Sequence, residues 1–280
     1  MTGPVAPPRT ARELTRRVDA DARLKGIPEK RARDWVSFMA IAGRLEEVGS
    51  SNDKSTFVVK GDVAIELRLR QKARATRDID LVVASHRQER VEALRSALDG
   101  SHLGFAFRVR GETHLMPNDT TRVEVPVEFG GRAWGTVPVD LSDDRQGGIE
   151  VEKVGALDLS EYGILGPTEL TCLSLRYQLA QKLHAMTEPP APGRPNERFH
   201  DLADVLLLTE LVTDLPSLRE ACLEVFAQRA THPWPASFDP PAEWEHPFEA
   251  LAAQTGLEPS RFAEAVVRAR TWINAIAGST

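Results

Sequence analysis

Two aspartates separated by one residue, Asp78 and Asp80, point most directly to chemistry in this chain. They border an apolar run, Ile79–Val83, that predicts a strand. Side chains at i and i+2 of a strand share a face, so the two carboxylates would repel each other unless a cation or protons neutralise them. The pair therefore indicates a site for a divalent cation that prefers oxygen ligands, Mg²⁺ above all.

Asp140 is the candidate third carboxylate, because it lies on the polar face of a second predicted strand. Two metal ions on such a triad could stabilise the attacking and leaving oxygens of phosphoryl or nucleotidyl transfer. The same Asp-x-Asp pattern also occurs on solvated strand faces and in turns. The surrounding residues therefore have to decide between the two interpretations.

Upstream of the aspartates, a β-prone run over 57–59 ends at Lys60-Gly61, where glycine permits a tight turn before a helix. The amides of a helix N-terminus form a natural anion site. Five cationic side chains follow before the carboxylates: Arg68, Arg70, Lys72, Arg74 and Arg77. This order suits a triphosphate held on a metal ion. The alternative is an ordinary solvated basic face.

The elements that would position these residues begin with predicted helices over 10–25, 29–48, 63–71 and 86–99, although the spacing over 63–71 also fits a strand. Residues 122–129 alternate valine with charged residues, which predicts a strand, and Pro126 favours a place at the edge of the sheet. Gly130-Gly131 predicts a hairpin turn. The partner strand, over about 134–141, carries Asp140 on the face opposite to its valines.

From residue 168 onward only helices are predicted, over 168–187, 197–213, 215–230 and 258–277. A Pro- and Trp-rich stretch over 232–248 is expected to be an irregular connection. The order predicts an α+β core with a small mixed sheet, followed by an all-helical domain. The predicted parts are a disordered tail over 1–9, a first domain over 10–165 and a helical domain over 166–280.

The composition sets the class of protein. Of 280 residues, 41% are hydrophobic, which is enough for a core and argues against disorder. Residues 1–77 carry 17 Lys and Arg against 10 Asp and Glu, which suits either a nucleic-acid footprint or solvated helix faces. The chain shows no secretory leader or membrane-length apolar stretch, so the expectation is a cytoplasmic protein without a membrane partner. Cys172 and Cys222 are expected to be buried free thiols.

The order Phe57-Val-Val-Lys-Gly-Asp62, then Arg77-Asp-Ile-Asp-Leu, resembles the signature of polymerase-β-type nucleotidyltransferases. More narrowly it resembles the AbiEii toxin family, which includes the mycobacterial MenT toxins. Two later family motifs are matched by Lys182 on a helix and by Arg198-Phe-His-Asp-Leu-Ala-Asp204. The resemblance touches roughly residues 55–235.

The resemblance implies transfer of a nucleoside monophosphate from an NTP to RNA, with the tRNA 3′ end as acceptor and arrest of translation as the result. It implies Asp78 and Asp80 as ligands of Mg²⁺ or Mn²⁺, to which the strand pattern adds Asp140 as the candidate third ligand. Lys60, Gly61, Arg77 and Lys182 would bind the nucleotide, and Asp201 would act as a base or positioning group. A cognate antitoxin protein is also expected.

Without the resemblance, the later motifs have simpler interpretations. Lys182 would be a solvated lysine on the polar side of a helix. Arg198, Asp201 and Asp204 share one helix face, where an ion pair contributes only about 0.3–0.5 kcal/mol. His184 and His200 are expected to be structural histidines.

The chain departs from the family where Asp62 replaces a glycine and Val63-Ala64 replace a serine or threonine. A carboxylate there would repel the phosphates, and the missing hydroxyl cannot bond them. Two other functions are therefore carried forward. One is a nucleotidyltransferase acting on a small molecule, and the other is a catalytically weak protein that binds a nucleotide or a partner.

Overall fold

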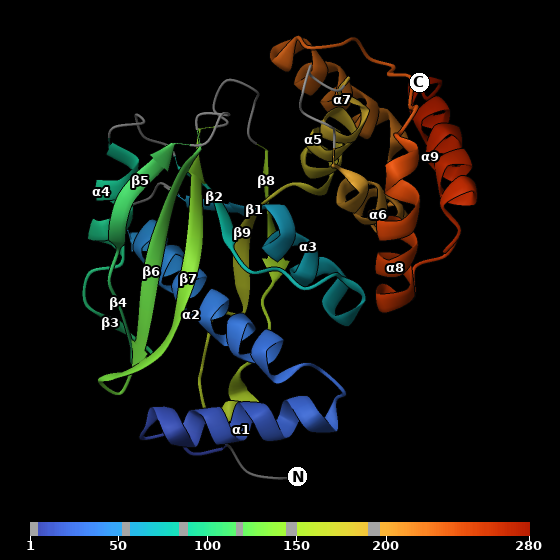
Figure 1. The fold of residues 1–280 in the computed structure, drawn as a ribbon. Coiled ribbons are helices and arrows are strands. Elements are labelled where there is room, and N and C mark those ends of the chain that lie inside the picture. Colours follow the sequence, from blue (N-terminus) through green and yellow to red (C-terminus); the bar gives the residue numbers. More distant parts are fainter. Residues whose placement is uncertain (1–4, 52–56, 84–88, 116–119, 144–149, 190–196) are drawn as a thin grey trace. The chain divides into compact units, whose positions relative to one another are not determined.

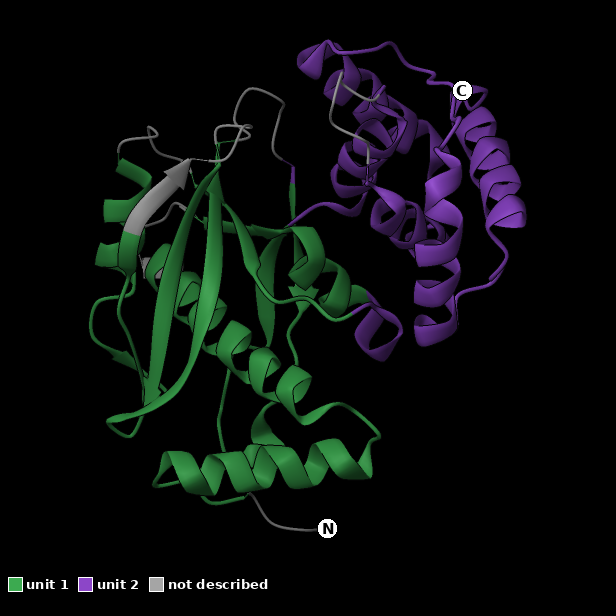
Figure 2. Cartoon of the chain, viewed as in Figure 1, with its two compact units in different colours: residues 1–68, 75–144, 151–172 green, residues 69–74, 145–150, 173–280 purple. Residues whose placement is uncertain are grey.

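The computed structural model describes residues 5–51, 57–83, 89–115, 120–143, 150–189 and 197–280 (Figure 1). The chain forms two compact units, shown in Figure 2. Unit 1 comprises residues 1–68, 75–144 and 151–172, and unit 2 comprises residues 69–74, 145–150 and 173–280. None of the helices in the described segments is long and apolar enough to span a membrane.

Unit 1 is built around a mixed nine-stranded sheet. Its strands are β1 Phe57–Lys60, β2 Ile79–Val83, β3 Ser101–His102, β4 Phe105–Phe107, β5 Arg110–Leu115, β6 Thr121–Phe129, β7 Arg132–Ser142, β8 Val151–Gly155 and β9 Glu169–Leu173. Across the sheet the order is β3-β4-β6-β7-β2-β1-β9-β8, and β5 also pairs with β6. Pairs β2–β7 and β1–β9 are parallel, whereas β1–β2 and β6–β7 are antiparallel. The predicted α+β fold with a mixed sheet is confirmed.

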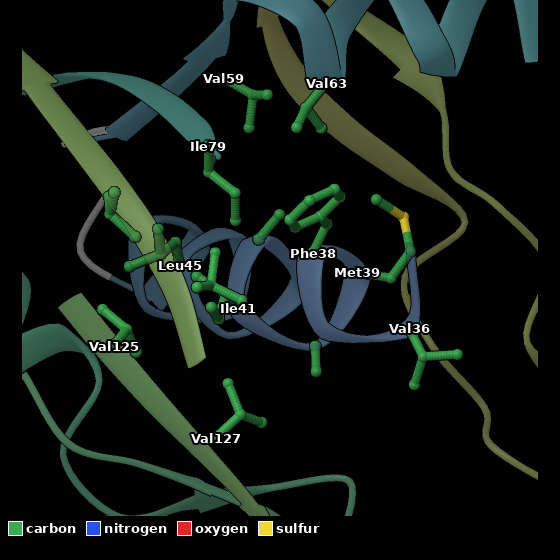
Figure 3. Packing of buried hydrophobic residues seen from close by; sticks show 14 of the residues in the cluster. Val36, Phe38, Met39, Ile41, Leu45, Val59, Val63, Ile79, Val125 and Val127 are labelled. Carbon is green, nitrogen blue, oxygen red and sulfur yellow. The ribbon is translucent and has the colours of Figure 1, made fainter. Parts of the chain in front are cut away.

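Helix α2, Glu29–Ser51, is the central element of the unit 1 core (Figure 3). Its buried run, which includes Phe38 and Ile41, packs against apolar side chains from several strands. The strand residues labelled in the figure are Val59, Ile79, Val125 and Val127. The other helices of the core region are α1 Ala11–Leu24, α3 Gly61–Leu69 and α4 Arg90–Ala97. Since side chains alternate along a strand, the residues on either side of Val59, Ile79, Val125 and Val127 point to the opposite, polar face of the sheet.

Several sequence predictions are confirmed at the level of single elements. Strand β2 spans Ile79–Val83 as predicted. Phe129 pairs with Arg132 across Gly130-Gly131, both with positive φ, as a two-residue hairpin turn requires. Part of the helix predicted over 86–99 lies outside the described residues, and α4 accounts for the rest. Of the tail predicted over 1–9, residues 1–4 lie outside the described residues.

Two predictions in unit 1 are wrong. The helix predicted over 168–187 begins only at Leu175, because residues 169–173 form β9, paired in parallel with β1. Pro126 does not mark an edge strand, since β6 lies between β7 and the pair β4 and β5. Its missing N–H falls opposite Arg108, in the break between those two strands, where Arg108 donates to the Pro126 carbonyl at 3.1 Å. Proline is tolerated there because the ladder is already interrupted.

Unit 2 consists of helices in its described residues: α5 Leu175–Thr187, α6 Phe199–Leu208, α7 Leu215–Arg229, α8 Glu245–Thr255 and α9 Phe262–Ala277. The stretch predicted as irregular over 232–248 already contains the start of α8, which is a correction. Helix α6 buries every residue from Asp201 to Leu208, so it is the core of this unit. Both cysteines are buried free thiols, as predicted.

His184 on α5 is a structural histidine, as predicted. Its Nδ1 lies 3.5 Å from Arg229 Nη1, and its Nε2 lies 3.0 Å from the Thr231 hydroxyl. Its ring packs edge-on against Phe226. Burial, followed by the charges of Arg229 and His232, lowers the pKa of His184 to about 4. The neutral imidazole is therefore the form that the folded unit accommodates.

This pKa predicts acid sensitivity. The pKa of His184 is lower in the folded protein than in the unfolded chain, so the unfolded chain takes up the proton first as pH falls. The free energy of unfolding therefore decreases between about pH 6.5 and pH 4, by at most about 3 kcal/mol. His184→Gln should be less stable at pH 7 but flatter across this window, measured by urea unfolding at several pH values. The exposed His246→Gln is the matched control. A His184→Gln profile parallel to that of the parent would contradict this role.

Candidate active site

Asp80 lies at the centre of the polar face of the sheet in unit 1. Strand β2 pairs on one side with β1, where Lys60 is opposite Asp80, and on the other side with β7, where Asp140 is opposite Asp80. Directly paired residues of adjacent strands point to the same face, so Asp80 and Asp140 lie side by side. Asp78 precedes β2 by one residue. The structure thus brings the three sequence-predicted carboxylates into one neighbourhood.

The electrostatics of this neighbourhood are dominated by excess negative charge. Burial, together with the carboxylates of Asp62, Asp78 and Asp140, raises the pKa of Asp80 to about 7, against the lowering effect of Lys60. Among the described residues, no hydrogen bond to the Asp80 carboxylate is present. A buried carboxylate surrounded by like charges favours a proton or a bound cation.

Arg122 on β6 is a site residue that the sequence analysis did not single out. It pairs across the hairpin with Asp140. Its Nε and Nη2 donate to the two Asp140 oxygens at 2.6 and 2.7 Å, and Nη2 also donates to Asp78 Oδ2 at 2.8 Å. These hydrogen bonds and charges raise the pKa of Arg122 above its ordinary value. One guanidinium therefore joins two of the three carboxylates.

The donor chemistry of this cluster fits a hard divalent cation, because every candidate ligand is a carboxylate oxygen and the carboxylates around Asp80 outnumber Lys60 and Arg122. As the described side chains stand, however, no group of three acidic, His or Cys side chains is arranged to hold a metal ion. Arg122 is bound to two of the carboxylates instead. A metal site here requires the guanidinium to move.

Gly61 is fixed at its position by the carboxylate beside it. Its φ is +61°, and a Cβ at this residue would lie 2.0 Å from Asp80 Oδ2. Helix α3 starts at Gly61, so the backbone turns sharply against the acidic cluster. Asp62 is in the first helical turn, and Val63 and Ala64 are buried where the family carries a hydroxyl. The loop that resembles a phosphate-binding turn therefore approaches Asp80 closely but carries an added negative charge.

The basic run extends from Arg68, in the last turn of α3, to Arg77, just before β2, and its side chains have different environments. Arg68 is 6% exposed and pairs with Glu152 at 2.5 Å, and Arg74 pairs with the buried Asp204 at 3.3 Å. These two side chains form ion pairs within the fold, so they are neither part of a solvated basic face nor available to a nucleotide. Lys72 is exposed and lies 3.9 Å from Glu210. Arg77 is exposed, and no partner for it is seen in the described part of the chain. Arg70 is also exposed, and Arg77 remains a nucleotide-binding candidate.

Lys182 lies in unit 2, on α5, and is not the solvated lysine that its position alone suggests. Its Nζ donates to Asp201 Oδ1 at 2.7 Å and to Asp204 Oδ2 at 2.8 Å. Lys182 is 11% exposed, Asp201 8% and Asp204 1%, so this is a buried pair of ion pairs rather than a surface contact. The structure brings together the two later motifs of the sequence.

A cavity of about 430 Å³ adjoins this group in unit 2, lined by Arg74, Glu197, Arg198, His200 and Asp201. Asp201 reaches the cavity lining and also lies 3.4 Å from Arg198. Asp204 is not part of the lining, because Lys182 and Arg74 enclose it. The two aspartates of the motif therefore have different environments.

The chain matches the family described as nucleotidyl transferase AbiEii toxin, type IV TA system, over residues 45–271. Among solved structures, MenT4, a nucleotidyltransferase toxin from Mycobacterium tuberculosis H37Rv, has a TM-score of 0.59 at 16% identity, covering 97% of this chain and 90% of that chain. A nucleotidyltransferase-like protein from Paracoccidioides brasiliensis has a TM-score of 0.41 at 16% identity, covering 69% and 88%. No curated protein sequence gives a significant match. The likeness to MenT4 shows the nucleotidyltransferase fold.

Replacing Gly61 tests the close approach to Asp80. Gly61→Ala should lower the free energy of unfolding by roughly 1 kcal/mol, because alanine is strained in the left-handed conformation. It should lower it further because the new methyl group overlaps Asp80 Oδ2. Gly26→Ala is the matched control, since Gly26 has φ +66° with nothing within 4 Å of a Cβ. Urea unfolding measures both. Equal losses in the two variants would mean that Asp80 does not restrict residue 61.

Replacing Lys182 tests the buried ion pairs. Lys182→Met leaves Asp201 and Asp204 with less compensation in a buried site, which should reduce the free energy of unfolding by about 3 kcal/mol. Lys30→Met, which removes a lysine 72% exposed and paired with Asp34, should change it by less than about 0.5 kcal/mol. Urea unfolding measures both. A small effect at Lys182 would show that the two aspartates do not depend on it.

Proposed function

The chain belongs to the AbiEii family of nucleotidyl transferase toxins, and we propose that it transfers a nucleoside monophosphate from an NTP to RNA in a metal-dependent reaction. The observation that carries the proposal is the in-register pairing of Asp80 and Asp140 on adjacent parallel strands, with Asp78 beside them. The pKa of Asp80 is raised mainly by burial and then by the neighbouring carboxylates, so a bound cation would favour its charged form. A divalent cation and its bound triphosphate would supply the missing partner.

In this reaction a hydroxyl oxygen of the acceptor forms a bond to the α-phosphorus of the NTP. The bond from that phosphorus to the bridging oxygen breaks, pyrophosphate leaves, and the hydroxyl proton is lost to a base or to water. Asp78, Asp80 and Asp140 are the residues that would hold Mg²⁺ or Mn²⁺, which supplies charge neutralisation at the phosphates. We expect the start of α3, after Lys60 and Gly61, to contribute to phosphate binding, because a helix N-terminus attracts anions.

The acceptor that we propose is the tRNA 3′ end, which the resemblance to the MenT toxins suggests. A protein that acts on tRNA and NTPs would work in the cytoplasm. Its family membership implies an antitoxin partner. Arg77, Lys182 and Asp201 remain proposed contributors to nucleotide binding and catalysis. Lys182 and Asp201 also form a buried ion pair that stabilises unit 2, in addition to any catalytic role.

Asp62 favours a second candidate function, a catalytically weak protein that binds a nucleotide or a partner. Its carboxylate adds to the negative charge at Asp80, where a phosphate would have to approach. The buried Val63 and Ala64 provide no hydroxyl to bond a phosphate oxygen. If Asp62 limits catalysis, Asp62→Gly should be more active than the parent chain.

A single assay separates these functions. The pure protein is incubated with each labelled NTP, Mg²⁺ or Mn²⁺, and total tRNA. The proposed function predicts label in tRNA that Asp80→Asn reduces by at least about a hundredfold, because a neutral amide cannot replace the central carboxylate. Asp34→Asn, at a surface ion pair, is the matched control and should retain activity.

Other outcomes point elsewhere. Label that appears without RNA, in a small acceptor, would indicate an enzyme acting on a small molecule. No transfer with any NTP and either metal would favour the binding protein. In cells, expression should arrest growth and Asp80→Asn should relieve the arrest. Equal toxicity of the variant and the parent would refute the catalytic proposal.

A further inference from the structure

We propose that Arg122 is an internal counter-ion that holds Asp78 and Asp140 together in the metal-free protein, and that a divalent cation must displace its guanidinium in order to bind. The inference rests on the proposed function, because it concerns the same three carboxylates. It adds a residue outside the predicted motifs that sets how tightly the site binds metal. It also gives the three carboxylates different parts in binding.

The geometry of the ion pairs supports this role. Arg122 uses Nε and Nη2 to contact both oxygens of Asp140, and the same Nη2 reaches Asp78. A planar guanidinium fits a carboxylate through two parallel hydrogen bonds, which makes this a specific contact rather than a loose surface pair. Asp140 is only 13% exposed, so its charge depends on a partner inside the protein.

A metal ion and this guanidinium compete for the same oxygens. Mg²⁺ binds carboxylate oxygens at about 2.0–2.1 Å, well inside the distances at which Arg122 contacts them. A cation at that position would face the positive guanidinium within a few ångströms, and like charges so close repel strongly in a partly buried site. Occupancy by metal and the present pairing of Arg122 therefore exclude each other.

Arg122 is able to leave. Its side chain is 37% exposed, more than either of its carboxylate partners, so the guanidinium can turn towards solvent without crossing the core. Asp80 differs from the other two carboxylates, because the hydrogen bonds of Arg122 go to Asp78 and Asp140 and not to Asp80. Asp78 and Asp140 can therefore become metal ligands only when Arg122 moves away, whereas Asp80 has no hydrogen bond with Arg122 to give up.

The competition predicts opposite effects on stability and on metal affinity. Arg122→Gln removes the counter-ion, so the metal-free protein should melt at a lower temperature while Mn²⁺ binds about tenfold more tightly. Arg122→Lys keeps a charge but loses the two-point contact, and should fall between the parent and Arg122→Gln. A residue that only supported the fold would lower the melting temperature and weaken metal binding, or leave it unchanged.

Arg33→Gln is the matched control for a partly exposed arginine on a buried aspartate. Arg33 is 34% exposed, it contacts both oxygens of Asp19 at 2.8 and 2.9 Å, and Asp19 is 13% exposed. This pair joins α1 and α2 within unit 1, and the hydrogen bonds seen between its side chains involve none of the three carboxylates. The control should lower the melting temperature of the metal-free protein without changing the affinity for Mn²⁺.

The experiment measures Mn²⁺ binding by titration calorimetry and melting by calorimetric scans, on the full chain without nucleotide. Tighter binding in Arg122→Gln, with Arg122→Lys intermediate, supports the proposal. Equal or weaker binding in both variants overturns it. Because Arg122→Gln could fail to fold, Arg122→Lys decides the result alone in that case.

Failure of the proposed metal site gives a different result. If the parent and Asp80→Asn bind Mn²⁺ equally, or if neither the parent nor any Arg122 variant binds it, the metal site itself is refuted together with this inference. If the parent binds Mn²⁺ and Asp80→Asn does not, the metal site stands, and only the Arg122 variants decide the role of the counter-ion.

Discussion

The repulsion between carboxylates on adjacent strands is the constraint on which the site in unit 1 depends. Asp80 and Asp140 are paired in register on two parallel strands, so the backbone itself holds the two side chains next to each other. The sheet cannot relax this repulsion, because shifting β2 by one residue would turn Ile79 and Leu81 out of the core. The charge must instead be balanced by what lies beside it.

Three features of unit 1 follow from that constraint. Lys60 is opposite Asp80 on the other neighbouring strand. Residue 61 has to be glycine, since any side chain there would enter the space of the Asp80 carboxylate. Arg122 supplies a guanidinium from the next strand beyond Asp140. For the proposed metal site these neighbours matter beyond stability, because they would determine how much negative charge is left for a metal ion and its triphosphate.

The sequence predicts the carboxylates well because their signals are local. The spacing of Asp78 and Asp80, and the limits of Ile79–Val83, need only the period of a strand. Arg122 could not be found in this way. Counting outward from the Gly130-Gly131 turn would pair Arg122 with Val139, on the wrong face. A bulge next to Gly135 shifts the register by one residue and places Arg122 opposite Asp140.

Residues 169–173, predicted as part of a helix, also show that local sequence patterns cannot reveal distant partners. Their run Glu-Leu-Thr-Cys-Leu directly precedes a strong helix, and only its parallel pairing with β1 makes it a strand. Local pattern cannot report a partner more than a hundred residues away. The burial of Lys182 is likewise invisible in sequence, because it requires Asp201 and Asp204 to meet it from a different helix.

The two aspartates of the Arg-x-x-Asp-x-x-Asp motif also cannot be treated as equivalent. Asp204 is 1% exposed and is held by Lys182 and Arg74, so it is positioned to anchor the buried charges of unit 2. Asp201 shares the same lysine but also lines a cavity, so it alone of the pair is placed to reach a ligand. A loss of activity on changing Asp204 would therefore report a disturbed ion-pair network. The same loss at Asp201 with stability retained would report a contact with substrate.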